Sequence, residues 1–219
     1  RHKEAAQSQE QSLLLAMLLS MPAAAALAAL SVPIVRVLFE RGAFDAGATI
    51  PVAQALVGYA WGLPAFVLIR VLQPGFFSRQ DTVTPTIFAG LSVLANIGIS
   101  LWLFPSLQHL GIALATTLSA WLNAGLLALF LARRGYFKFT GASLRKHLLT
   151  IASSLVMAGV LYLFAQRAGA IFASGAPFLL QAAALLAICI FGTVTYFTLV
   201  HFTGAQPLGL LLRRLRRRS

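Results

Sequence analysis

The longest stretch of this sequence without an Asp, Glu, Lys or Arg runs from Thr82 to Ala132. A helix needs about 20 residues to cross a bilayer core of roughly 30 Å, so this stretch is too long for one crossing and long enough for two. Its only cluster of helix-breaking and polar residues is Phe104–His109, where we predict a short loop. Two membrane-spanning helices are therefore expected, over residues 85–103 and 110–131.

Four further stretches have the length and composition of membrane spans. They are Ser12–Val35, Ala46–Ile69, the segment between His147 and Gln166, and residues 177–200. Of all residues 59% are hydrophobic and 10% are charged, which is unlike a soluble domain. A count of five would need one span to lie along the membrane surface, and none has the charged face of such a helix. We predict an all-α fold, a polytopic membrane helix bundle with about six transmembrane helices.

Prolines mark several places where these helices should begin or bend. Pro22, Pro33 and Pro64 lie in or near the ends of the first two spans, where kinks are expected. Pro177 suits the first turn of the last helix, because the N–H that proline lacks is not needed there.

The Lys and Arg residues predict the orientation of the bundle. With six spans, 14 of the 17 fall on one side of the membrane, and Arg36, Arg41 and Arg167 fall on the other. Basic residues are enriched in cytoplasmic loops, so both termini are expected in the cytoplasm. The 14 are Arg1, Lys3, Arg70, Arg79, Arg133, Arg134, Lys138, Arg145, Lys146, Arg213, Arg214, Arg216, Arg217 and Arg218.

A formal net charge of +12 also raises the possibility of nucleic-acid binding, and Arg213–Arg218 resembles a basic tail. However, the basic residues flank apolar spans, where topology and anionic lipid headgroups already account for them. We therefore expect membrane lipids as partners, and no nucleic acid.

The acidic residues argue against catalysis by this segment. Glu4, Glu10, Glu40, Asp45 and Asp81 all lie outside the apolar spans, so no carboxylate pair is placed for a metal ion or a proton path within the membrane. We find no spacing typical of a metal site and no phosphate-binding glycine loop. The sequence predicts no catalytic residue, no metal and no cofactor.

A single cysteine, Cys189, lies in the middle of the sixth span. It excludes a disulfide within the chain, and packing is its expected role.

Two polar loops stand out from this background. The first is Val37–Asp45, after the first span, and the second is Gln73–Pro85, between the second and third spans. In the second loop Pro74 and Gly75 should end one helix, Asp81 or Thr84 can cap the next, and Pro85 suits its first turn. The aromatic pair Phe76 and Phe77 is expected at the headgroup level beside Arg79.

The residues of these two loops resemble a known family. The sequence RVLQPGFFSRQDTVTP at residues 70–85 looks like the signature of the MurJ (MviN) family of lipid II flippases, and VLFERGAF at residues 37–44 looks like the neighbouring element of that family. The likeness extends over essentially the whole chain. It implies a transporter of the multidrug/oligosaccharidyl-lipid/polysaccharide exporter type, with two six-helix lobes and two additional helices, fourteen spans in total.

On that template, residues 1–133 resemble the last four helices of the second lobe, 134–146 a cytoplasmic basic loop, 147–203 the two additional helices and 204–219 a basic cytoplasmic tail. The chain opens with Arg1 and lacks the pattern of a signal peptide, so we expect a C-terminal fragment. The missing partner is the N-terminal lobe, which in the family supplies most of the cavity arginines.

The resemblance implies a flippase rather than an enzyme. Its substrate would be lipid II, the undecaprenyl-pyrophosphate-linked disaccharide-pentapeptide used for cell wall biosynthesis, and its location the bacterial cytoplasmic (inner) membrane. It also implies that the last two helices border a groove for the undecaprenyl tail. Two alternatives stay open: another exporter of the same superfamily, carrying a different lipid-linked glycan or a drug, and a non-catalytic membrane scaffold.

Six residues are candidates for substrate binding or gating. On the outer side, Arg36 and Arg41 could hold an anionic headgroup, or simply extend to the interface, and Glu40 could pair with either. On the inner side, Arg70 could guide phosphate at a gate or anchor the topology. Arg79 and Asp81 complete the set, with helix capping as the alternative role of Asp81.

Overall fold

A computed structural model describes residues 2–40, 46–135, 141–173 and 176–204. Within these ranges every regular element is a helix, which confirms the all-α class. The helices are α1 (His2–Ala29), α2 (Ser31–Phe39), α3 (Ala46–Ala60), α4 (Leu63–Leu72), α5 (Pro74–Phe77), α6 (Val83–Arg133), α7 (Gly141–Arg167) and α8 (Phe178–Thr203).

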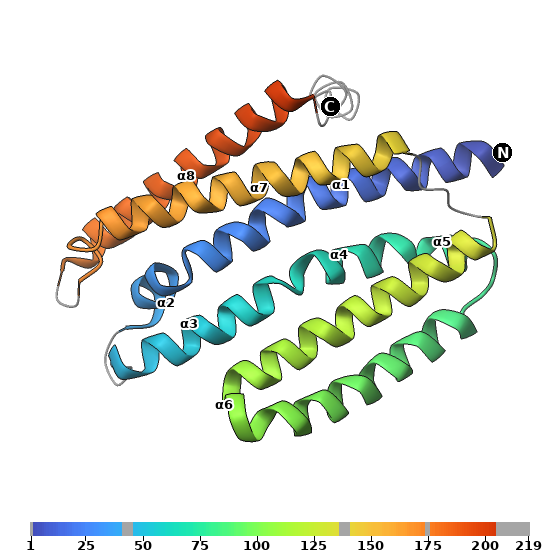
Figure 1. Ribbon diagram of the computed structural model, residues 1–219, viewed down its shortest axis with the longest axis horizontal. Coiled ribbons are helices and arrows are strands. Elements are labelled where there is room, and N and C mark those ends of the chain that lie inside the picture. Colours follow the sequence, from blue (N-terminus) through green and yellow to red (C-terminus); the bar gives the residue numbers. More distant parts are fainter. Residues whose placement is uncertain (1, 41–45, 136–140, 174–175, 205–219) are drawn as a thin grey trace.

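Among the described residues, five helical segments are long and apolar enough to cross a membrane, and one of them supplies two crossings. This segment is α6, which folds back on itself at Gln108, a residue with the non-helical angles φ 47° and ψ −121° (Figure 1). Six crossings therefore result, as the hydropathy pattern predicted. The turn is tighter than the predicted loop, because only Gln108 departs from helical geometry between Phe104 and His109.

Two contacts hold the arms of α6 together. The Asn96 side chain donates to the hydroxyls of Thr116 (3.4 Å) and Ser119 (3.3 Å) on the opposite arm. At Gly111 the arms come so close that an added Cβ would lie 2.9 Å from the carbonyl carbon of Leu103. A glycine is needed there because any side chain would overlap the facing backbone.

The second predicted span consists of α3 and α4, separated by a break at Trp61–Gly62. The amide of Gly62 bonds to the carbonyl of Tyr59, and Pro64 has no N–H to donate. Two carbonyl oxygens freed near the break are satisfied by α6: Thr117 Oγ1 donates to Gly58 (2.7 Å), and Trp121 Nε1 donates to Trp61 (2.9 Å). A break inside a membrane span needs such partners, since hydrocarbon offers none.

The prolines act in three ways. Pro33 follows the break between α1 and α2, and Pro64 follows the break between α3 and α4, so both lie at interruptions as expected. Pro22 instead lies inside α1, which continues to Ala29. Pro177 precedes α8 at its N-cap, with ψ 130°, so the prediction that it forms part of the first turn was wrong by one position.

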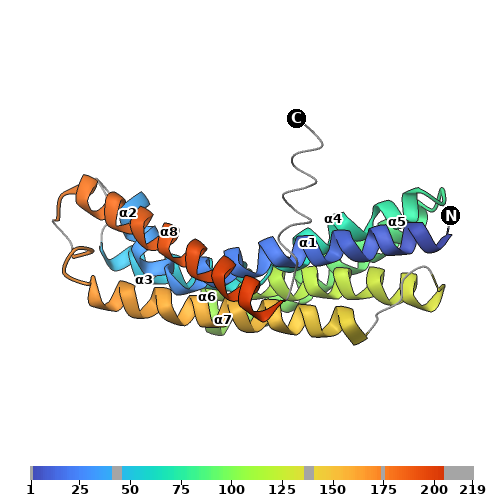
Figure 2. The same cartoon turned by 90° about the horizontal axis from the view of Figure 1, so that it is seen from above.

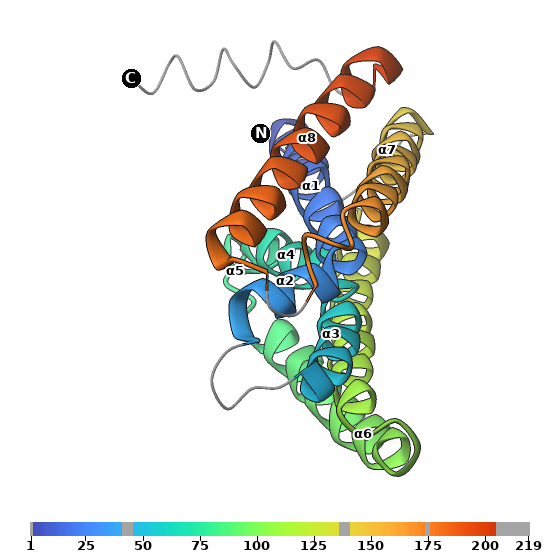
Figure 3. The ribbon, with the colours of Figure 1, turned by 90° about the vertical axis from the view of Figure 1, so that its left-hand side faces the viewer.

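The helices pack in a layered bundle. α7 packs along α1, and α8 crosses α7 (Figures 1 and 2). α3 and α4 lie between α1 and α6 (Figure 1). In Figure 3, seen nearly end-on, α8 lies at one edge of the bundle and the folded α6 at the other. The start of α1, α5, the end of α6 and the start of α7 share one end of the molecule, while α2 and the α7–α8 connection lie at the opposite end (Figure 1).

Two clusters of buried side chains stabilise this arrangement. One joins α1, α2, α7 and α8 around Leu18, Leu161 and Tyr196, and the other joins α1, α4, α5 and α6 around Leu72, Phe76 and Leu127. Large apolar side chains such as Leu101 and Trp102 on the outer arm of α6 are instead exposed, as expected for a surface that meets lipid.

Candidate functional site

The six candidate residues do not form one site, because they lie at opposite ends of the bundle. Arg36 and Glu40 belong to the end of α2, whereas Arg70, Arg79 and Asp81 belong to the α4–α6 region. Arg41 lies outside the described residues.

Arg36 and Glu40 form a polar cluster that connects three parts of the chain. Arg36 Nε donates to Glu40 Oε2 (3.1 Å), and another guanidinium nitrogen of Arg36 donates to the carbonyl of Phe172 in the α7–α8 connection (2.6 Å). The buried hydroxyl of Thr49, in α3, donates to the same Glu40 oxygen (2.8 Å). The Glu40 side chain is only 11% exposed, so this contact is more buried than the exposed pair that the sequence suggested.

At the other end, Arg70 is exposed on the last turn of α4. Arg79 donates to the carbonyl of Gly75, which closes the turn after α5. Asp81 accepts from the amide of Thr84 (3.0 Å) and from its hydroxyl (2.8 Å), so the predicted helix cap is confirmed. These bonds lower the pKa of Asp81 below its usual value, and attraction to the Arg134 guanidinium lowers it further.

The two rings of the aromatic pair differ in burial, and the expectation that both lie at the headgroup level was wrong for Phe76. Phe77 is exposed, but Phe76 is buried and stacks against Phe130 at a centroid distance of 5.7 Å. Phe76 is therefore a core residue, because α5 turns its ring toward α6. The local sequence does not indicate which of the two adjacent phenylalanines is buried.

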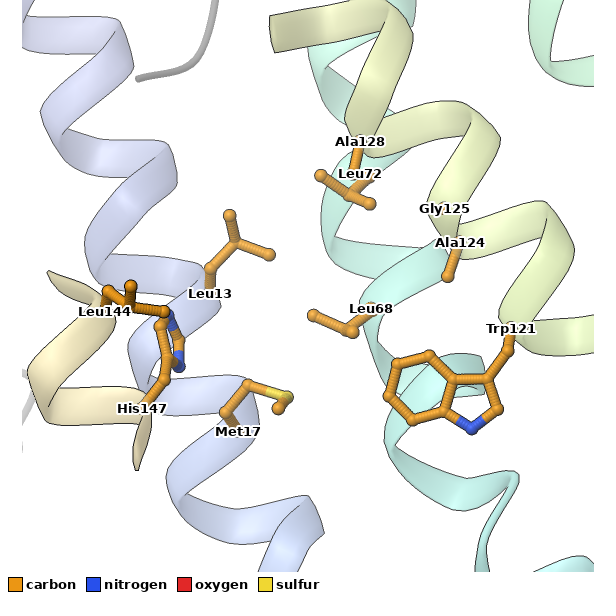
Figure 4. A pocket seen from close by; sticks show the side chains of 10 residues that line it. All are labelled: Leu13, Met17, Leu68, Leu72, Trp121, Ala124, Gly125, Ala128, Leu144 and His147. Atoms are coloured by element: carbon orange, nitrogen blue, oxygen red, sulfur yellow. The ribbon is translucent and has the colours of Figure 1, made fainter. Parts of the chain in front are cut away.

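Between these two ends lies an apolar groove, which consists of two pockets that share Trp121. The first, of about 270 Å³, is lined by α1, α4, α6 and α7, and Figure 4 shows Leu13, Met17, Leu144 and His147 facing Leu68, Leu72 and Trp121. The second, of about 440 Å³, extends between α1 and α7 on one side and Val57, Trp61 and Pro64 on the other.

The dimensions and chemistry of the groove fit an extended apolar chain. Its lining contains no Asp, Glu, Lys or Arg. On α7 the lining residues run from Leu144 to Tyr162, a rise of about 27 Å at 1.5 Å per residue. That length is close to the thickness of a bilayer core.

Sequence reasoning missed most of the residues that line the groove. Trp121 is the clearest case, since its indole both divides the groove and bonds to the α3–α4 break. Tryptophan is expected at membrane interfaces, and nothing near it in the sequence indicates the carbonyl that it meets.

Six apolar crossings, polar clusters at both ends and an apolar groove between them define a multi-pass helical membrane protein. Comparison with known proteins then gives the family. The family model described as "Lipid II flippase MurJ" matches residues 1–206, so the chain belongs to the MurJ family of lipid II flippases.

Individual relatives agree with this result. A protein of Rhizobium tropici described as a probable lipid II flippase MurJ is 39% identical over 99% of this chain and 40% of its own length. A protein of Rhizobium meliloti with the same description is 40% identical over 98% of this chain and 40% of its own length. The "Lipid II flippase MurJ" of Burkholderia cenocepacia is 37% identical over 66% of this chain and 28% of its own length. The chain thus spans about two fifths of the length of the first two relatives.

Proposed function

We propose that the complete protein carrying this chain moves lipid II from the inner to the outer leaflet of the bacterial cytoplasmic membrane. The family match over residues 1–206 carries this proposal. A bulky polar headgroup crosses hydrocarbon only at a large desolvation cost, so the protein must offer it a hydrated route while the lipid tail stays in an apolar environment. Alternating access, in which a cavity opens to each side in turn, satisfies both needs.

Within this protein, residues 1–133 would form the last four helices of the second lobe, and 147–203 the two additional helices. Residues 134–146 would be a cytoplasmic loop and 204–219 a cytoplasmic tail. In the structure α7 begins at Gly141, so Arg145 and Lys146 already belong to its first turns. An N-terminal lobe of the complete protein would complete the central cavity.

The orientation that we propose places both termini in the cytoplasm. The distribution of charge along the helices supports it: α5, the end of α6 and the start of α7 share one end of the bundle, and these elements flank or contain Arg79, Arg133, Arg134, Arg145 and Lys146. Arg36 and Arg167 belong to elements at the other end. Because Lys and Arg are enriched on the cytoplasmic side of membrane proteins, the more basic end would face the cytoplasm.

We also propose roles for the candidate residues. Arg70, exposed near the basic end, would attract the substrate phosphate at the cytoplasmic opening. Arg79 and Asp81 would shape the rim of that opening through the turn that they stabilise. Arg36 and Glu40, joined to each other, would hold the outer end closed, and Arg41 would contact the headgroup on that side.

The apolar groove would hold the undecaprenyl tail during transfer. Of the two additional helices that the resemblance places beside the tail, α7 lines this groove and α8 does not. The uncharged lining of the groove and its length of about 27 Å support this assignment. A polyprenyl tail has no hydrogen-bonding groups, so it needs only an apolar environment away from water and headgroups. The groove would provide such an environment.

Depletion and complementation test the transport activity. In cells whose own lipid II flippase is depleted, expression of the complete protein should restore growth and prevent lysis. Lipid II on the outer leaflet should return at the same time, measured by an externally added enzyme that cleaves its headgroup. Survival without return of outer-leaflet lipid II would favour the scaffold alternative, and export of another glycan lipid would favour a different exporter.

A matched pair of glycine variants tests the groove. Gly159 lines it and has open space where a Cβ would point, so Gly159→Leu should fill the groove and slow transfer several-fold. Gly98 has equal space but lies on the exposed arm of α6, so Gly98→Leu should leave transfer unchanged. Equal effects of the two variants would show that the groove does not hold the tail.

A further inference from the structure

A small pocket at the α5–α6 end brings together two arginines that are distant in the sequence. Its volume is about 280 Å³, and Arg79 and Arg134 both line it. The other lining residues are Gly75, Phe76, Asp81, Phe130 and Leu131. The pocket is separate from the apolar groove and shares no lining residue with it.

Arg134 is held in the pocket by an aromatic cluster. Its guanidinium carbon lies 4.4 Å from the centroid of the Phe130 ring, a distance typical of a cation–π contact. Phe130 is in turn fixed by stacking on Phe76 and by an edge contact with Phe88, each at 5.7 Å. Arg134 also follows the last residue of α6, where the helix dipole favours a positive charge.

Arg79 is the second arginine that lines the pocket. Its guanidinium is oriented by the bond to the carbonyl of Gly75, in the short helix α5. The nitrogen that makes this bond also lies 3.5 Å from the Ser78 hydroxyl oxygen. A guanidinium has five N–H donors in one plane, so it can bond to several acceptors at once. Two arginines held in this way on one pocket are suited to planar, bidentate recognition of oxyanions.

One carboxylate also lines the pocket, that of Asp81. Its two hydrogen bonds from Thr84 show that it caps α6, and its pKa stays below the usual value. The charged side chains of the lining are thus two arginines and one aspartate, which leaves a net positive charge. The Phe130 and Phe76 rings form the apolar part of the lining.

We propose that this pocket binds a phosphate-bearing anion at the membrane surface, either the phosphate of a lipid headgroup or a soluble phosphate. The pocket has room for a phosphate group and part of the molecule that carries it, and the two guanidinium groups can donate to the phosphate oxygens. The lining residues belong to α5, to the end of α6 and to the residues that directly follow these two helices. These elements share one end of the bundle (Figure 1), the end that would face an anionic leaflet in the proposed orientation. The inference does not depend on the transported substrate, because binding can be measured without transport.

The test uses the complete protein, purified in a neutral detergent and titrated with phosphatidylglycerol or phosphatidylcholine. Native mass spectrometry then counts the bound lipids. Arg134→Gln should weaken phosphatidylglycerol binding about tenfold, because a hydrogen bond to a charged group is worth roughly that factor. Arg133→Gln is the matched control: it removes the same charge from the neighbouring exposed residue, which does not line the pocket.

A second arm separates the two sources of phosphate. If phosphatidylglycerol binds more tightly than phosphatidylcholine and only Arg134→Gln removes the preference, the ligand is a lipid headgroup. If the two lipids bind alike but inorganic pyrophosphate binds with an affinity that Arg134→Gln reduces, the source is soluble. Equal losses in Arg133→Gln and Arg134→Gln, or no loss in either, would overturn the proposal. Unchanged thermal unfolding of both variants confirms that they are folded.

Discussion

Tyr196 in α8 donates a 2.7 Å hydrogen bond to the backbone carbonyl of Leu18 in α1. That carbonyl is the one that Pro22, four residues later, cannot reach with an N–H, because proline has none. The tyrosine hydroxyl therefore replaces the missing donor. Both residues are buried, so the bond connects α8 to α1 in the interior of the packed helices.

We expect Tyr196→Phe to lower the free energy of unfolding by about 1–2 kcal/mol, since it leaves the Leu18 carbonyl unpaired in an apolar region. In a Pro22→Ala background the helix regains its own N–H, and the same substitution should cost less than half as much. Thermal unfolding of the four proteins in one detergent measures this cycle. Equal costs in both backgrounds would show that the hydroxyl does not replace the missing donor.

The turn of α6 predicts opposite effects for two glycines of the same helix. Gly111→Ala places a Cβ 2.9 Å from the Leu103 backbone, so the arms must separate at a cost of about 1–3 kcal/mol. Gly98→Ala meets nothing within 4 Å and should be neutral or stabilise the helix by about 0.5–1 kcal/mol. Thermal unfolding measures both effects. Equal shifts of the melting temperature in the two variants would contradict the prediction.

Substitutions in the Arg36–Glu40 cluster should lower the stability of the protein. Glu40→Gln keeps an acceptor for Thr49 but removes the charge that Arg36 faces, and Glu40→Ala removes both. We expect losses of about 1 kcal/mol for the first and about 2–3 kcal/mol for the second. A loss of transfer in Glu40→Gln with an unchanged melting temperature would instead indicate direct contact with the substrate.

Asp81 predicts a pH dependence at the start of α6. Its pKa is lowered in the folded protein, so its stabilising effect is fully present above the ordinary value of 3.8 and is lost as the pH falls through the lower, folded value. The melting temperature should therefore fall on acidification below about pH 4. Asp81→Asn keeps a capping side chain without the carboxylate, so its curve should be flatter there. Identical curves for the two proteins would contradict this role.

Cysteine labelling tests the orientation. Cys189, on an exposed position of α8, is first replaced by serine. In this background Ser78→Cys, next to α5, should be protected from a membrane-impermeant maleimide in intact cells, and Ala170→Cys, after α7, should react. The reverse pattern would place the basic end outside and remove the support for the proposed direction of transfer.

Hydropathy was sufficient to predict the helical class and six crossings, because both depend only on local composition. The two loop motifs likewise indicated the family, which the comparison confirms over residues 1–206. Helix ends were less accurate: α1 begins at His2, ten residues before the predicted span, since polar residues continue a helix beyond the apolar part that crosses the membrane.

The tertiary structure decided which partner each polar group finds. Glu40 had two candidate arginines nearby in the sequence, and it bonds to Arg36 and also to Thr49 of α3. From the sequence, Arg134 was only one of the basic residues of a predicted loop. In the structure it lines the same pocket as Arg79, which lies 55 positions earlier in the sequence. Inside the membrane, where water is absent, a freed carbonyl such as that of Leu18 is satisfied by another helix, and the identity of that partner depends on which helix faces meet. Which helix faces pack against each other is determined by the whole bundle, and it cannot be read from any single segment of the sequence.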